Sequence, residues 1–390
     1  MPDFLQAIPA DVVYLALVVA VLLLPKILQR TPIPGPVWAL LLGVLAGQVF
    51  PASADDPVIG LLATFGIASL FLFAGLEVEV AELRAVWRPL AGHLLLRAAA
   101  LVAVALLATQ YFGFEPRAAG ILALALLTPS TGFILDTLNR LGLPQDTQFW
   151  IKSKAIAGEL LALAVMFVLL KSDSAANLLT TSAWLVLLVV LLPVFFIAFA
   201  RWVLPQAPGS EFSFLIVVGI VAAYVTKQLG VYYLVGAFIA GFIARQLTRR
   251  VPELGRPDTM RALQLFAGFF VPFYFFHAGQ AIPREALTWD SLGIGLALTA
   301  IFVPLRIGGI VAQRMVQLRE RWLDAVRVAM PLSPTLIFTM VLAAILRDSF
   351  GVPASVYGGL LVYAVLTTLV PLLVQQEVEL DLTATRAPVP

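Results

Sequence analysis

The stretch Thr128-Pro129-Ser130-Thr131 lies inside an apolar run near residues 117–138 and interrupts it with a proline between hydroxyl side chains. A second stretch of this kind, Ser333-Pro334-Thr335, lies inside the apolar run near 326–346. Proline removes a backbone donor and clashes with the carbonyl of the preceding helical turn. One proline alone is more often a simple kink, but the matched pair of Pro-Ser/Thr stretches predicts two broken helices. In lipid, the freed backbone groups need side chains, water or ions as partners. The two stretches therefore predict two broken helices that cross near the middle of a membrane.

The composition around these breaks is that of a membrane protein. Of the 390 residues, 61% are hydrophobic and only 12% are charged, and the mean hydropathy is +0.97. A soluble protein of this length cannot bury so much apolar surface in one or two cores. The net charge of +2 argues against nucleic acid as a partner, because it supplies no basic footprint. Without cysteines and with only two histidines, the chain is not expected to hold a disulfide, a thiolate site or a histidine-built metal site.

Thirteen apolar runs, separated by turn and charge signals, are each predicted to span the bilayer as a helix. The fold class expected is therefore an all-α polytopic membrane protein with short connections between its spans. The runs lie near residues 11–28, 35–50, 58–76, 88–111, 117–138, 150–170, 180–203, 212–227, 231–246, 261–281, 291–313, 326–346 and 353–375.

Basic residues are distributed unevenly among the loops. With the N-terminus outside, sixteen lysines and arginines fall in loops and the tail on the cytoplasmic side, against five on the opposite side. Cytoplasmic loops carry an excess of such residues, so this bias predicts an outside N-terminus and a cytoplasmic C-terminus. The first apolar run lacks a basic leader and a cleavage signal, so it is expected to stay as the first span. We expect a multi-pass protein of the cell inner membrane.

Short sequence matches indicate an internal repeat. Ala74-Gly75 and Ala278-Gly279 are 204 residues apart, and Pro129 and Pro334 are 205 residues apart. The nearly equal offsets relate the first six spans to the last six, with span seven as the linker. An odd number of spans separates the copies, so they enter the membrane in opposite senses. Inverted repeats of this kind are typical of secondary transporters.

Glu159 is the acidic residue closest to the predicted middle of the membrane. It follows Trp150 by nine residues, which at ~1.5 Å per residue places it ~13 Å into a core ~30 Å thick. An intramembrane carboxylate is a functional hypothesis by default. We expect Glu159 to bind a proton and a metal cation, Na⁺ or K⁺, in turn, with neutral oxygens from Thr128, Ser130 and Thr131. A carboxylate that serves only as an ion-pair partner is the alternative.

Two arginines lie within spans and need partners there. Arg306 is about fifteen residues into the eleventh span, and it is expected to balance helix-end carbonyls where Pro129, Ser333, Pro334 and Thr335 form the crossing. A salt bridge between Arg306 and Glu159 is the alternative. Arg97, in the fourth span, is expected to perform the same service in the other repeat.

Two lysines and two histidines complete the set of titratable groups within spans. Lys152 and Lys154 lie in the first turns of the helix that carries Glu159, and both are expected to extend to the cytoplasmic interface as entrance charges. His93 and His277 are expected to be packed, hydrogen-bonded side chains rather than proton carriers.

Several short segments, taken together, resemble the cation/proton antiporter-2 family, which includes Kef-type potassium and Nap-type sodium exchangers. The segments follow the family's order over nearly the whole chain. They are residues 73–77, residues 127–132, the Glu159 segment, residues 271–279, Arg306 and residues 361–371.

The resemblance implies a homodimer in which a core domain slides against a dimerisation domain. By the family pattern, residues 1–87 and 212–281 form the dimerisation domain and residues 88–170 and 291–375 form the core. Residues 180–203 are the linker span, and 376–390 are a short cytoplasmic tail. Kef-type relatives carry a nucleotide-binding domain, but this chain has no G-x-G-x-x-G motif and no such domain is expected.

One departure from the family pattern bears on stoichiometry. The family usually has two adjacent polar or acidic residues in the sixth span, and here the pair is Gly158-Glu159. A single carboxylate favours electroneutral exchange of one cation for one proton. The leading hypothesis is therefore a proton-coupled antiporter of Na⁺ or K⁺ without a cofactor. A sodium-coupled symporter of an organic anion, on a similar inverted repeat, is the alternative, and no enzyme motif is present.

Overall fold

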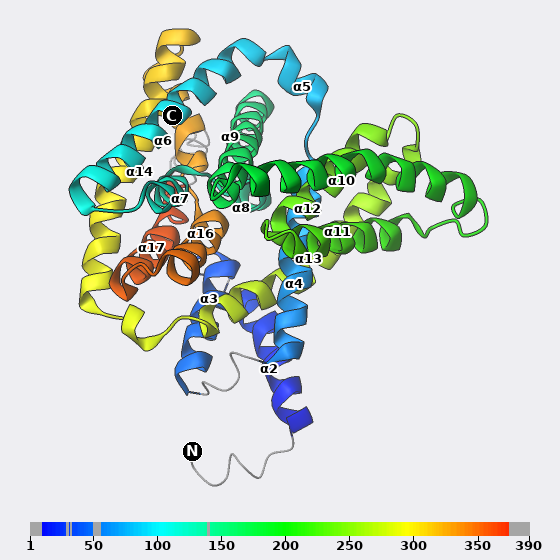
Figure 1. Ribbon diagram of the computed structural model, residues 1–390, viewed down its shortest axis with the longest axis horizontal. Coiled ribbons are helices and arrows are strands. Elements are labelled where there is room, and N and C mark those ends of the chain that lie inside the picture. The colour runs from blue at the N-terminus through cyan, green and yellow to red at the C-terminus, as the bar shows by residue number, and fades with distance from the viewer. Residues whose placement is uncertain (1–9, 29–30, 32, 50–55, 139–140, 374–390) are drawn as a thin grey trace, which may run out of the picture.

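A computed structural model describes residues 10–28, 31, 33–49, 56–138 and 141–373, and within these ranges the protein is entirely helical (Figure 1). The predicted tail 376–390, Arg30, Arg140 and Arg386 lie outside the described residues. The helices are α2 (Ala10–Ile27), α3 (Gly35–Val49), α4 (Pro57–Leu76), α5 (Val80–Ala85), α6 (Trp87–Phe112), α7 (Pro116–Leu127), α8 (Thr131–Leu138), α9 (Gln145–Lys171), α10 (Ala175–Trp202), α11 (Glu211–Gln228), α12 (Tyr233–Leu247), η3 (Pro252–Gly255), α13 (Pro257–Gln280), η4 (Arg284–Ala286), α14 (Trp289–Gln317), α15 (Trp322–Ala329), η5 (Met330–Leu332), α16 (Leu336–Phe350) and α17 (Ala354–Thr367).

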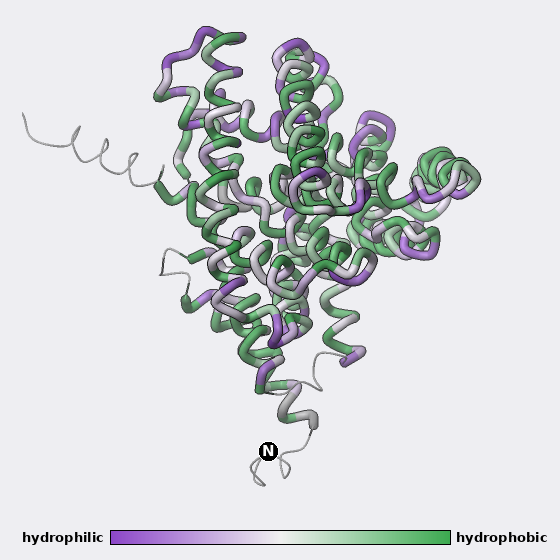
Figure 2. Tube along the Cα trace, turned by 60° about the vertical axis from the view of Figure 1, so that its left-hand side comes forward, coloured by the Kyte–Doolittle hydropathy of each residue, from purple (hydrophilic) through white to green (hydrophobic). Residues whose placement is uncertain are grey.

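The helices account for the predicted spans. Within the described ranges, eight helical segments are long and apolar enough to cross a membrane, and one bent pair forms a ninth. Four shorter apolar helices, in α2, α3, α12 and α17, supply the rest. Each of the thirteen predicted spans therefore has a helical counterpart, and the predicted fold class is confirmed. Figure 2 shows hydrophobic residues along the helices, with hydrophilic residues gathered mainly at the turns.

Local chemistry sets several helix ends. Asp56 precedes α4, and its carboxylate accepts hydrogen bonds from the backbone N–H groups of Val58 and Ile59, while Pro57 occupies the first helical position. Gly113 and Gly351 end α6 and α16 with φ of 68° and 62°. This left-handed conformation costs glycine little because it has no Cβ atom. These caps fix where the long apolar segments leave their helical paths.

Close packing of backbones joins α3, α4, α12 and α13. A Cβ atom on Gly75 would collide with the backbone of Phe238, and one on Gly241 with that of Leu72, so α4 and α12 touch at both glycines. Gly43 of α3 lies equally close to the backbone of Phe276 in α13. In Figure 1, α6, α7, α14, α16 and α17 lie to the left of α4, and α10 and α11 lie to its right. Helix α4 is thus packed where it can face the broken helices.

Both predicted breaks are present. Helix α7 ends at Leu127 and α8 begins at Thr131. The second break lies between η5 and α16, and the two arms of that span are bent by 48° relative to each other. The prolines predicted to interrupt the helices, Pro129 and Pro334, lie in these two breaks.

Candidate functional site

The two breaks meet through their backbones. The N–H of Ser130, in the first break, donates a hydrogen bond of 2.9 Å to the carbonyl of Pro334, in the second. The predicted crossing of the two broken helices is therefore confirmed. Because a broken helix leaves unsatisfied carbonyls at one end and N–H groups at the other, the crossing brings four such ends together.

Side chains from one broken span cap the ends of the other. The Ser130 hydroxyl accepts hydrogen bonds from the N–H groups of Ile337 (2.9 Å) and Phe338 (3.3 Å), at the start of α16. In return, the Thr339 hydroxyl of α16 donates to the carbonyl of Ala125 at 2.7 Å, near the end of α7. A hydroxyl oxygen accepts two hydrogen bonds. Ser130 is thus committed to α16, and this structure does not leave it free as the oxygen ligand that we expected.

Arg306 supplies hydrogen-bond donors to the backbone carbonyls at the end of η5. Its guanidinium donates to the carbonyls of Leu332 (2.8 Å) and Ser333 (2.7 Å), where η5 ends. It also donates to the hydroxyl of Tyr363 at 3.2 Å, and that hydroxyl donates to the carbonyl of Leu126 at 2.6 Å. The expected contact between Arg306 and helix-end carbonyls is confirmed. Through Tyr363 the same arginine reaches the end of α7 as well.

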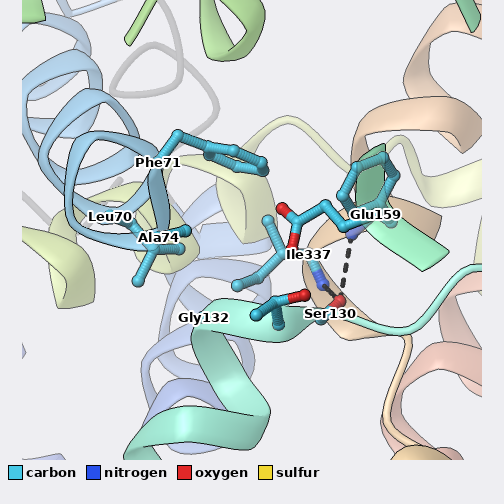
Figure 3. A pocket seen from close by; sticks show the side chains of 9 residues that line it. Leu70, Phe71, Ala74, Ser130, Gly132, Glu159 and Ile337 are labelled. Atoms are coloured by element: carbon cyan, nitrogen blue, oxygen red, sulfur yellow. Dashed lines mark hydrogen bonds between the residues drawn. The ribbon is translucent and has the colours of Figure 1, made fainter. Parts of the chain in front are cut away.

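Glu159 projects from α9 toward this crossing, and its side chain is only 1% exposed. In Figure 3 it faces a pocket between the first break and α4. Ser130, Thr131 and Gly132 form one wall, and Leu70, Phe71 and Ala74 of α4 form the opposite wall. The pocket is too narrow to admit a water-sized sphere. The carboxylate is therefore covered by apolar side chains of α4 in this conformation.

Four buried oxygens around the breaks have no hydrogen-bond partner among the residues that the structure describes. They are Glu159 Oε2 and the hydroxyls of Thr128, Thr131 and Ser333. Thr131 and Glu159 line the same pocket. Burying a polar atom without a partner costs roughly 1–3 kcal/mol, and oxygen atoms of this kind are the ligands that hard cations prefer. The arrangement therefore suits a small cation or a proton.

The charge of Glu159 is not balanced by an ion pair within the part of the chain that the structure describes. Arg306 is occupied by carbonyls, so the alternative Arg306–Glu159 salt bridge is wrong for this structure. Nor do three or more carboxylate, histidine or cysteine side chains gather anywhere in the described ranges.

The two lysines of α9 differ. Lys152 is part-exposed and forms a salt bridge of 2.7 Å with Glu77, at the end of α4. Lys154 is fully buried, and its ammonium donates to the side-chain oxygen of Gln313 in α14. The prediction that Lys154 extends to the interface is therefore wrong, because its side chain lies inside the protein, against α14. The pairing of Gln313 with Lys154 could not be seen from sequence.

Arg97 packs against Gly158, the residue next to Glu159. A Cβ atom at Gly158 would lie 3.0 Å from Nη1 of Arg97, so the guanidinium fills the space that a side chain would need. Within the described residues Arg97 donates no hydrogen bond to the carbonyls at the end of α7; Tyr363 and Thr339 occupy two of them. The expected role of Arg97 at the first break therefore stays a prediction, without the direct carbonyl contacts that Arg306 makes at the second.

His93 differs from its predicted role, and two residues of the crossing were not predicted at all. His93 is buried, as expected, but neither of its ring nitrogens has a hydrogen-bond partner among the described residues. Tyr363 and Thr339 were missed as parts of the crossing. Both are polar residues inside apolar helices, and a buried tyrosine hydroxyl normally needs a partner, so that signal was present.

Comparison with known proteins supplies independent information. A family model described as "Sodium/hydrogen exchanger, transmembrane" matches residues 15–376. A search of the curated proteins found no match. Among solved structures, the sodium proton antiporter MjNhaP1 from Methanocaldococcus jannaschii is similar at 15% identity with a TM-score of 0.68, over 94% of this chain and 96% of that chain. The two proteins thus share a fold over nearly their whole lengths.

Proposed function

This chain belongs to the sodium/hydrogen exchanger transmembrane family and is a membrane transporter rather than an enzyme, and from that premise we propose that it exchanges Na⁺ or K⁺ for H⁺ at Glu159. The observation that carries the proposal is the buried carboxylate beside the crossed breaks, with one oxygen unpartnered. The solved protein that shares the fold is described as a sodium proton antiporter, which supports sodium as the cation.

Competition at one carboxylate couples the two fluxes. A proton or a cation neutralises Glu159, and the two cannot occupy its oxygens together. Thr131, which lines the same pocket and whose hydroxyl has no partner among the described residues, adds a neutral oxygen to the bound cation, and Thr128 lies in the same break. The carboxylate carries one negative charge, and either H⁺ or a monovalent cation neutralises it. The loaded site therefore has the same net charge in both halves of the cycle. Exchange is then electroneutral and one for one.

Access to the carboxylate requires movement of α4 relative to the crossing. The pocket is closed on one side by Leu70, Phe71 and Ala74, and it has no room for a water molecule. The crossing itself is tied together by hydrogen bonds among α7, α16 and α17. We therefore favour a cycle in which residues 88–170 and 291–375 slide as a core against residues 1–87 and 212–281. The small pocket also argues against a symporter of an organic anion.

The proposal also includes how the protein assembles and how it is oriented in the membrane. Residues 1–87 and 212–281 would form the contact of a homodimer in the lipid bilayer, with the N-terminus outside and the C-terminus in the cytoplasm. The sequence bias of basic residues supports this orientation.

The decisive experiment measures cation flux into proteoliposomes after a pH jump. The parent protein is expected to drive Na⁺ or K⁺ exchange, with an apparent cation affinity that falls as pH decreases, because protons compete for Glu159. Glu159→Gln is expected to fold and to lose exchange, since an amide neither releases a proton nor carries charge. Glu82→Gln, on the exposed helix α5, is the control and should exchange like the parent. Robust exchange by Glu159→Gln would refute the mechanism, and a rate that depends on membrane potential would refute one-for-one stoichiometry.

A further inference from the structure

A second cavity lies away from Glu159, between α3 and the helices α14 and α17. Its volume is about 730 Å³. Leu40 and Val44 of α3 form one wall, and Leu292 of α14 with Leu361 and Val365 of α17 form the other. Pockets that bind small molecules have volumes of roughly 300–1,000 Å³. The cavity is therefore large enough for a ligand. It lies apart from Glu159 and the helix crossing, between the two units that the proposed exchange cycle moves past each other.

The chemistry of the walls excludes a hydrated ion as the occupant. None of the described residues that line the cavity is charged, and apolar side chains make up most of its surface. The hydroxyls of Thr288 and Ser291, which also line it, are bonded to each other at 3.0 Å. A cation in this space would lack the oxygen ligands that replace its water shell. An apolar chain, in contrast, gains from every contact with these walls.

The position and depth of the cavity fit an acyl chain of one membrane leaflet. The lining of α17 extends from Gly358 to Leu366, a rise of ~12 Å at ~1.5 Å per residue. One leaflet contributes about half of a hydrocarbon core ~30 Å thick. The cavity is open at its rim, where Leu287 is 48% exposed and Trp289 is 86% exposed. Tryptophan is enriched where the hydrocarbon meets the headgroups, so Trp289 marks the headgroup end of the cavity.

Charged residues at this end match a zwitterionic headgroup. Arg284, Glu285 and Asp290 are all exposed; Glu285 and Asp290 adjoin lining residues in the chain, and Arg284 lies two residues from the lining residues Ile282 and Ala286. The guanidinium of Arg284 is held in place by hydrogen bonds of 2.9 and 2.8 Å from Nε and Nη2 to Gln48. Its remaining nitrogen can donate to a phosphate, and guanidinium groups suit phosphate geometry. The two carboxylates repel an anionic headgroup but attract an amine.

From these features we propose that the cavity is a binding site for an aminophospholipid of the surrounding bilayer. One acyl chain fills the space between α3 and α17, the phosphate contacts Arg284, and the amine lies near Glu285 and Asp290. This proposal does not depend on ion exchange at Glu159.

The test is native mass spectrometry of purified, delipidated protein incubated with phosphatidylethanolamine or phosphatidylglycerol of identical acyl chains. We expect one phosphatidylethanolamine retained per chain, and retention of phosphatidylglycerol weaker by about tenfold, which corresponds to the loss of one good polar contact. Leu292→Trp should fill the cavity and lower phosphatidylethanolamine retention to a similar extent. Leu296→Trp, one turn further along α14 and outside the cavity lining, should retain the lipid like the parent.

Further variants keep the test decisive. Val44→Trp fills the cavity from the opposite wall, so a folding defect of Leu292→Trp would not leave the question open. Arg284→Gln should lower retention without changing the cavity. Retention by both cavity-filling variants equal to that of the parent would overturn the site, and equal retention of phosphatidylglycerol would overturn the headgroup assignment. Glu159→Gln should retain the lipid fully, which separates this result from the test of exchange.

Discussion

The hydroxyl of Ser130 accepts hydrogen bonds from two backbone N–H groups at the start of α16, so a side chain in one broken span caps the other. Replacing Ser130 with alanine leaves both N–H groups without that partner in a buried, apolar setting. Loss of such a cap costs about 0.5–2 kcal/mol. We expect Ser130→Ala to lower the melting temperature measured in detergent.

Ser69 provides the matched control for this variant. It is also a buried serine, but its hydroxyl bonds to the carbonyl of Gly66 within its own helix, α4. Ser69→Ala is expected to melt closer to the parent than Ser130→Ala. Equal melting of the two variants would contradict the capping role of Ser130.

Arg306 is a second single residue that stabilises the crossing, because its guanidinium donates directly to the carbonyls of Leu332 and Ser333. Arg306→Ala leaves both acceptors unpaired, and each unsatisfied buried group costs roughly 1–3 kcal/mol. We expect a clear fall in melting temperature, while the ratio of Na⁺ to K⁺ transport stays unchanged. Arg306→Lys should recover part of the stability. A variant that melts like the parent but has altered ion preference would show that Arg306 acts on the ion instead.

At this scale the sequence predicts a residue best when its signal is local. A proline in an apolar run and a carboxylate in the middle of a span were enough to identify Pro129, Pro334 and Glu159. The cap formed by Ser130 was missed because its partner in α16 is 207 residues away. Lys154 was misplaced for the same reason, since its partner Gln313 is 159 residues away in the chain.

At the scale of elements, α4 and α9 are linked by the salt bridge between Glu77 and Lys152. If α9 moves with the core and α4 with the dimerisation domain, this contact must break in every cycle. Fixing the two positions together should then stop exchange. We expect Glu77→Cys with Lys152→Cys, joined by a bifunctional methanethiosulfonate reagent, to lose exchange, and a reducing agent to restore it. The chain has no native cysteine, so other positions do not react.

A second ion pair offers the control. Glu79 pairs with Arg245 of α12, and both residues lie in elements that we assign to the dimerisation side. Cross-linking Glu79→Cys to Arg245→Cys by the same reagent should leave exchange intact. Normal exchange by the cross-linked 77–152 pair would rule out relative movement of α4 and α9.

Most helices were predictable as elements, because long apolar runs have few alternatives in a chain of this composition. Their ends were less so. Helices α12 and α17 have only 15 and 14 residues, because turns follow them at residues 248–250 and 368–371. At the second break, whose arms are bent by 48°, backbone N–H groups donate to Ser130 of the first break and to Thr367 of α17, and neither contact could be read from the sequence.

At the scale of the whole molecule, the remaining prediction concerns orientation. The loop after α12 carries the exposed residue Arg249, and α14 begins with the exposed residues Trp289 and Asp290, which the predicted topology places at the opposite end of the spans. In intact cells, an impermeant thiol reagent should label Asp290→Cys but not Arg249→Cys. Opened membranes should allow both to react. Labelling of Arg249→Cys from outside would invert the proposed topology.

The overall organisation could be read from sequence as far as its repeat and its number of spans. The matching offsets of the two Ala-Gly and two proline positions indicated that the breaks would meet, and the hydrogen bond between Ser130 and Pro334 shows that they do. The packing of Arg97 on Gly158 and the cavity beside α3 were not predictable, because each depends on three-dimensional spacing between distant helices.

The reciprocal caps of the two breaks also constrain how the protein is made. A chain is synthesised from its N-terminus, and its segments enter the membrane in that order. The break after α7 therefore reaches the bilayer before Pro334, Thr339 and Tyr363, the residues that satisfy its backbone groups, have been translated. Unsatisfied backbone groups are costly in lipid. The first broken helix must be sheltered by water, neighbouring helices or the insertion machinery. The pocket beside Glu159 is completed only when Ile337 and Phe338 arrive.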